Sequence, residues 1–153
     1  MEINDQFPNE TAEEFDDNSE KREREYDRII QLFEADMKKQ GLSLQTTRKH
    51  GDHVFIFLGE YVAYRHEMNL LNSIDFIDEY FCDYFIRKVA RTKVERIKAH
   101  ATSLKKFYKW LSEQDVITRE SYKAFFDNYT SRIQNWEKIY HSFASGEPRI
   151  IFS

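Results

Sequence analysis

Residues 91–111 read RTKVERIKAHATSLKKFYKWL, and this stretch predicts the helix around which the rest of the chain is organised. Its apolar residues recur at steps of three and four, the period of an amphipathic helix with one broad apolar stripe. The stripe consists of Val94, Ile97, Ala101, Leu104, Phe107, Tyr108 and Leu111. We expect this stripe to lie in the core of an all-α protein.

The same helix carries a dense positive charge. Between positions 87 and 109 the chain has nine lysines or arginines and a single acid, Glu95. A cluster of this kind attracts a phosphate backbone, although a run of charge is more commonly a solvated helix surface. The charge alone leaves both interpretations open.

Length and composition limit the class of protein. A chain of 153 residues is one ordinary domain. Its 16% aromatic content, with only four glycines and two prolines, predicts long helices with few tight turns. Cys82 is the single cysteine, so an intrachain disulfide is excluded. The N-terminus lacks a secretory signal and no apolar run approaches the ~18 residues of a membrane span, so we expect a cytoplasmic protein.

Charge is distributed unevenly along the chain. The formal net charge is −4, but residues 1–20 hold eight of the 27 acids and no lysine or arginine, which leaves 19 acids against 23 bases in the remainder. We interpret 1–20 as an acidic flexible leader, 21–145 as a helical domain and 146–153 as a C-terminal tail. The leader either competes for the basic helix or serves only solubility.

The remaining segments predict a compact bundle of about five helices. The first runs from about 20 to 40 and ends at Gly41, a residue suited to a left-handed cap. The second starts at the N-cap Ser43 and runs to about 68, with Gly51 marking either a close helix crossing or a weak point. Asp75 is expected to cap a third helix that reaches about 89, before the basic fourth helix.

A fifth segment, 118–144, starts at the cap residue Thr118 and keeps an aromatic stripe at helical spacing throughout. Unbroken, it would be roughly 40 Å long, more than a domain of this size needs. It therefore either extends to meet a partner or breaks near residues 128–131 and folds back. Trp136, Tyr140 and Phe143 would need a cover from the first helix or from a second copy of the chain, and we expect a homodimer through this helix.

Three motifs follow one another through the middle of the chain. A Leu-Ser-x-x-Thr helix start at Leu42, Ser43 and Thr46 is followed by the aromatic residues Phe57 and Tyr61. An Ile-Asp pair then opens a helix at positions 74 and 75. The last motif is an L-x-x-L-(R/K)-x-F-Y-x-x-L helix before an isoleucine, matched by Ala101, Leu104, Lys105, Phe107, Tyr108, Leu111 and Ile117.

In the order and spacing of these motifs, residues 25–117 resemble the core-binding domain of tyrosine recombinases of the phage-integrase type, also called the SAM-like N-terminal domain. The chain departs from the family at His50, where a tyrosine is usual, at Ala101, which replaces a leucine, and at 118–120, which replace an Asn-Pro. The resemblance implies four or five helices that form one half of a clamp on duplex DNA. Its Ser/Thr helix and its basic Phe-Tyr helix would face the grooves.

Only 36 residues follow Ile117, too few for the Arg, Lys, His, Arg and Tyr constellation of the family's catalytic domain. We therefore expect no catalysis and no cofactor, and predict a DNA-binding protein of recombination or mobile-element biology. The residues predicted to face DNA are Ser43, Gln45, Thr46, Arg48, Lys49, Arg91, Lys93, Arg96, His100 and Lys105, of which Gln45, Thr46 and His100 would touch bases.

The alternative is a helical interaction or dimerisation module that reuses the same fold. Its partner surface would be the aromatic stripe of the fifth segment, and its basic helix would bind an acidic protein or the leader. The sequence pI of about 5.8 favours this alternative, whereas the two basic segments favour DNA. His50 and His53 could be part of a metal site, but no third ligand has matching spacing, so no metal is expected.

Overall fold

The computed structural model describes residues 18–90 and 93–146 and confirms the all-α class, since its regular elements in these ranges are all helical. None of its helices there combines the length and the apolar character that a bilayer span needs. The acidic leader up to position 17 and the tail from position 147 lie outside the described residues.

The first half of the chain forms two packed helical segments. Helix α2 spans Ser19–Lys39 and ends before Gly41, whose φ of 97° confirms the predicted left-handed cap. Helix α3 spans Leu44–Phe55 and continues through η1, a wider π-type stretch over Ile56–Tyr61, and η2, a 3-10 turn over Val62–Tyr64. The predicted second helix is therefore one continuous helical segment that changes from α-helical to π-type and then to 3-10 geometry.

Gly51 marks the crossing of α2 and α3. A Cβ atom at this position would lie 2.7 Å from the Cδ atom of Glu34 on α2, which is closer than real contacts allow. Of the two meanings open for this glycine, the close helix crossing is the one that the structure supports.

The third predicted helix is divided into short pieces. These are the 3-10 turn η3 (Ser73–Phe76), the α-helical turn α4 (Ile77–Glu79) and the π-type stretches η4 (Tyr80–Tyr84) and η5 (Ile86–Ala90). The prediction that Asp75 caps this segment is wrong: it starts two residues earlier, and the main-chain N–H of Asp75 bonds to the carbonyl of Asn72. Ser73 is buried there and shares a hydrogen bond with the Tyr108 hydroxyl, so a distant contact determines where the segment begins.

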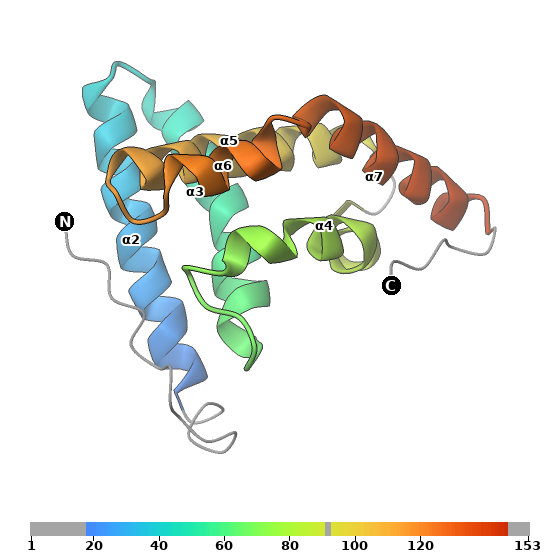
Figure 1. The fold of residues 1–153 in the computed structure, drawn as a ribbon, viewed down its shortest axis with the longest axis horizontal. Coiled ribbons are helices and arrows are strands. Elements are labelled where there is room, and N and C mark those ends of the chain that lie inside the picture. The colour runs from blue at the N-terminus through green and yellow to red at the C-terminus, as the bar shows by residue number, and fades with distance from the viewer. Residues whose placement is uncertain (1–17, 91–92, 147–153) are drawn as a thin grey trace.

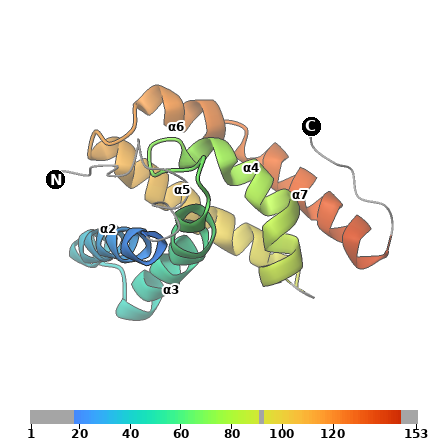
Figure 2. The same ribbon diagram turned by 90° about the horizontal axis from the view of Figure 1, so that it is seen from below.

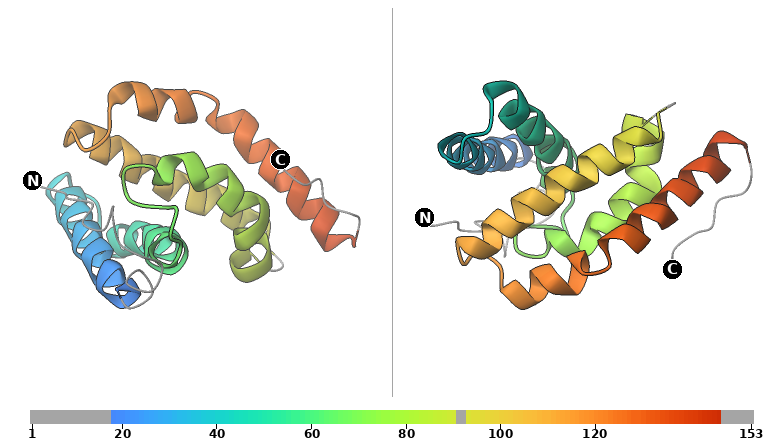
Figure 3. Two further views of the ribbon diagram at one scale, coloured as in Figure 1. Left: turned by 60° about the horizontal axis from the view of Figure 1, so that its bottom comes forward. Right: turned by 90° about the horizontal axis from the view of Figure 1, so that it is seen from above.

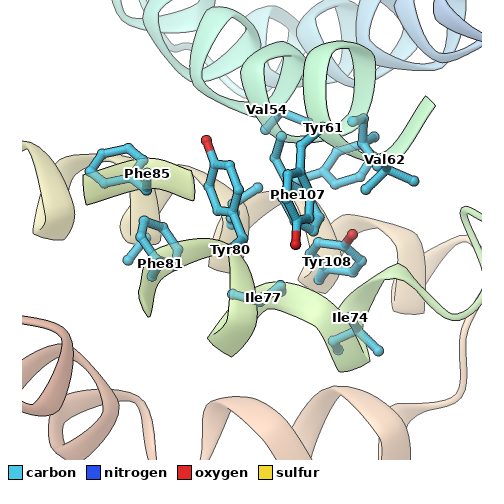
Figure 4. Packing of buried hydrophobic residues seen from close by; sticks show 14 of the residues in the cluster. Val54, Tyr61, Val62, Ile74, Ile77, Tyr80, Phe81, Phe85, Phe107 and Tyr108 are labelled. Carbon is cyan, nitrogen blue, oxygen red and sulfur yellow. The ribbon is translucent and has the colours of Figure 1, made fainter. Parts of the chain in front are cut away.

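Helix α5 (Glu95–Glu113) is the central element of the fold. It lies between the α2–α3 pair on one side and α4 with α7 on the other (Figures 2 and 3). Phe107 and Tyr108 lie between the α3 segment and the segment that begins at Ser73 (Figure 4). The apolar residues of α5 that are almost completely buried are Ile97, Ala101, Leu104, Phe107, Tyr108 and Leu111. This is the predicted apolar stripe without Val94, which precedes the helix and is half-buried.

The fifth predicted helix is broken. Helix α6 spans Arg119–Phe126, with Thr118 as its N-cap as predicted, and helix α7 spans Tyr129–Ala144 (Figure 1). The break lies at residues 127 and 128, at the start of the range 128–131 that the sequence suggested. Arg132 bridges it by donating to the Phe125 carbonyl oxygen at 3.0 Å.

The break lets α7 fold back onto the α4 and η4 segment. The Trp136 ring stacks on Phe81 with 4.4 Å between centroids, and its Nε1 donates to Asp78 at 2.8 Å. Trp136 is only 1% exposed and Tyr140 is also buried, so both are covered within the chain, and the cover of Trp136 comes from the α4 and η4 segment instead of the expected first helix. The homodimer stays a prediction. Phe143 is 38% exposed and is the one member of the predicted dimer surface at the molecular surface.

Candidate nucleic-acid interface

The N-terminal half of α3 presents a polar strip to solvent. The Ser43 hydroxyl accepts the main-chain N–H of Thr46 at 3.1 Å and donates to the Thr46 hydroxyl at 3.0 Å. Ser43 therefore caps the helix as the sequence predicted, and the Thr46 hydroxyl accepts the hydrogen of the capping hydroxyl. Beyond the cap, exposed side chains line a shallow depression formed by Leu44, Gln45, Arg48, Lys49, Asp52 and His53.

On α5, the basic side chains diverge. The Arg96 guanidinium donates to the Val89 carbonyl at 2.9 Å and so anchors the start of the helix to η5. Lys105 is half-buried, with its Nζ 4.6 Å from the centroid of the Tyr129 ring, so it points toward α7 rather than toward α3. Lys93 is exposed in the turn before α5, and Arg91 lies outside the described residues.

Helices α3 and α5 meet at a cluster of three histidines and a serine, which we call the histidine cluster: His50, His53, His100 and Ser103. The Nδ1 atoms of His50 and His53 lie 2.8 Å and 2.9 Å from the Ser103 hydroxyl oxygen. The His53 and His100 rings stack with 3.7 Å between centroids. The prediction that His100 touches a base is wrong, because its side chain is buried between α3 and Phe85 and is only 5% exposed.

Burial opposes protonation of all three rings. Burial lowers the pKa of His53 to about 4, with Lys49 and His50 adding to the effect. Burial also lowers the pKa of His100 to about 3, with His53 and Arg96 contributing next. The pKa of His50 is lowered by burial, then by Lys106 and Lys49. Lys49, Arg96 and Lys106 are therefore each close enough to at least one ring to lower its pKa.

Lys49, Arg96 and Lys106 thus surround one helix–helix contact, and we call these three residues the basic face. In the described part of the chain none of them forms an ion pair with a carboxylate. Lys106 was absent from the predicted DNA-facing residues. Lys106 lies three residues after Ser103 on the same side of α5. The sequence could have indicated Lys106 only if Ser103 had been known to face α3.

Arg48 marks the edge of this surface. On its far side a group of carboxylates from α2 and α3 lines a depression together with Ile30, Gly51 and Phe55. Burial, followed by repulsion from Asp52 and Asp27, raises the pKa of Glu34 there, while Arg48 lowers it. The positive surface is therefore bounded by a negative one between α2 and α3.

Of the residues predicted to face DNA, Lys49 and Arg96 each act on the His100 ring, and Gln45 and Arg48 lie nearer the start of α3. It does not bring His100 or Lys105 to that surface. The described residues contain no group of three or more histidine, cysteine, aspartate or glutamate side chains arranged to hold a metal ion.

No protein-family model, curated protein or solved structure gives a significant match to this chain. The resemblance to the recombinase core-binding domain therefore depends on the three sequence motifs alone, and the function has to be argued from the geometry of the surface.

Proposed function

We propose that this chain binds duplex DNA through the basic face and does not cut it, in a role related to recombination or mobile elements. The observation that carries the proposal is that Lys49 from α3 and Arg96 and Lys106 from α5 all act on the histidine rings at one helix–helix contact. Lysine and arginine side chains held by helices are the usual partners of DNA phosphates, which provide most of the affinity of such complexes.

The histidine cluster suggests a serine–histidine pair, but its geometry argues against a nucleophile. Ser103 is 0% exposed, so no phosphodiester can reach its hydroxyl. That hydroxyl donates to the Ala99 carbonyl at 3.2 Å. The proposal is therefore limited to binding, and the cluster is assigned the task of holding α3 on α5.

The alternative, a dimerisation module, has less support. It was motivated by an aromatic stripe on the fifth segment, and two of the three residues in that stripe are buried within the chain. The area that Phe143 alone could bury is small compared with the ≈ 800 Å² per partner that a stable interface buries.

Anisotropy titration of a labelled random duplex with the full chain tests the proposal. We expect binding that weakens with salt, with a log–log slope of about −3 to −5. The triple variant K49Q/R96Q/K106Q should reduce the steepness of that slope by about 3 and weaken binding at about 50 mM salt at least about tenfold.

The matched control is R119Q/K123Q/K138Q, which removes the same charge from exposed positions on α6 and α7. It should retain most of the affinity and the slope. Equal losses in the two triple variants would show that net charge alone drives binding, and no binding at low salt would refute the proposed function. Circular dichroism of each variant confirms that the helices are retained.

A further inference from the structure

The histidine cluster is unusual because three ionisable rings occupy the place where a helix contact normally has apolar residues. A hydroxyl has one hydrogen and accepts two hydrogen bonds. The single hydrogen of Ser103 can point to the Ala99 carbonyl or to one ring nitrogen, so at most one of His50 and His53 accepts from it. At least one of the two rings therefore donates its Nδ1–H to Ser103, and the Nε2 atom of that ring is the one that takes up a proton.

His100 completes the cluster without a hydrogen bond at Nδ1. That atom is buried and has no partner among the described residues, while the ring packs between His53 and the edge of Phe85. His100 therefore acts as an apolar ring at neutral pH. A phenylalanine would fit the same stacking role without carrying a titratable nitrogen.

The charges that face the cluster oppose protonation of its rings. From α3 these are Lys49 and Asp52, and from α5 they are Arg96 and Lys106. Asp52 is the one acid among them and acts on His53. The third neighbouring segment contributes Phe85, which has no charge. A proton on any ring therefore meets mainly cations, and protons on both His53 and His100 would place two positive rings 3.7 Å apart.

We propose that the histidine cluster is an acid-released latch, which holds the N-terminal half of α3 against α5 at neutral pH and lets the two helices separate in acid. The inference goes beyond the proposed function and does not depend on it, because it concerns the contact between the helices and not what their surface binds.

The direction of the pH effect follows from proton binding. A solvated histidine takes up its proton near pH 6.5, whereas the folded pKa values of His53 and His100 are about 4 and about 3. Between those values the separated helices bind more protons than the docked helices, so acidification favours separation. The contact is fully stable above about pH 6.5 and weakens progressively as the pH falls toward 4. The contact of α7 with η4 consists of Trp136 on Phe81 and lacks such a cluster, so it should outlast the release of α3.

Hydrogen exchange followed by mass spectrometry on the full chain tests the latch, at about pH 7.5 and about pH 5, with rates corrected for intrinsic exchange. We expect protection in α3 to fall by at least about tenfold more than protection in α7. In the variant H53Q/H100F, which removes the two stacked titratable rings and leaves His50, most of this difference should disappear. The control H141Q removes an exposed histidine from α7 and should behave like the unmodified chain.

A fall in protection that is equal in α3 and α7 would overturn the latch, as would a double variant that responds to acid like the unmodified chain. Nuclear magnetic resonance of the histidine rings provides a measurement that needs no variant. The latch requires the rings of His53 and His100 to titrate well below the ordinary value of about 6.5, and titration of both at that value would overturn it.

Discussion

Two buried glycines, Gly51 and Gly59, lie about two turns apart on the α3–η1 segment and have different neighbours. At Gly51, the nearest atoms to a new Cβ are the flexible end of Glu34 on α2, whereas at Gly59 they belong to the ring of Phe55, 2.5 Å away. A glutamate end can move aside, but a ring packed against the core has little freedom. The same substitution should therefore have opposite effects at the two positions.

Gly51→Ala should raise the free energy of unfolding by up to about 1 kcal/mol, because alanine is the better residue in a helix interior. Gly59→Ala should lower it by about 1–3 kcal/mol, because the Phe55 ring must shift. Urea unfolding followed by circular dichroism measures both values. Shifts of the same sign at both positions would contradict this account of the two glycines.

At the scale of the elements, Asp78 connects two segments that are distant in sequence. Its carboxylate accepts from the Arg132 guanidinium and from the Trp136 indole, and both donors lie on α7. Because Arg132 also bonds to the Phe125 carbonyl, one arginine links α6, α7 and α4. These contacts explain why the long aromatic segment breaks and folds back instead of extending into solvent.

Asp78→Ala should lower the free energy of unfolding by about 1–3 kcal/mol, because it leaves the buried indole N–H without an acceptor. The matched control is Asp83→Ala, which removes the partner of Arg87 from an exposed ion pair on the same segment. Such pairs contribute about 0–1 kcal/mol, so the control should change little. Thermal unfolding of both variants gives the comparison, and equal effects would mean that Asp78 does not hold α7.

At the scale of the whole molecule, the charge is divided between the acidic leader and the basic face. Residues 1–17 contain seven acids and no lysine or arginine, and they directly precede the start of α2. Ser19 and Arg22 are buried, so a deletion meant to remove only the leader should stop at position 17.

If the basic face binds DNA, deleting residues 1–17 should raise the affinity for duplex because a competing negative charge is removed. The gain should be largest at low salt, where the screening length grows from ~10 Å at 0.1 M toward ~30 Å at 0.01 M. Anisotropy titration over this range measures it. A control variant that changes the seven acids to their amides keeps the length of the leader and removes only its charge. If neither the deletion nor this variant changes the affinity for duplex, the leader does not compete with DNA.

The sequence by itself determined the all-α class and the approximate course of the helical segments, because these depend on residues a few positions apart. The apolar period of α5, the hydroxyl caps at Ser43 and Thr118 and the left-handed turn at Gly41 were all predicted and are present. Each is decided within one or two turns of the chain.

Only the tertiary structure decided which side chains meet. Lys105 and Lys106 are neighbours in sequence, yet one approaches Tyr129 on α7 and the other acts on His50 of α3. His100 belongs to a basic stretch of the sequence, yet its side chain is buried. Trp136 is covered by Phe81, which lies 55 positions earlier in the chain. The π-type turns of η1 and η4 likewise carry aromatic rings that pack across segments, because Phe57 and Tyr61 of η1 lie against Tyr80 of η4. These outcomes depend on how helices separated by tens of residues pack together, and the periodicity of a single helix carries no information about its partner.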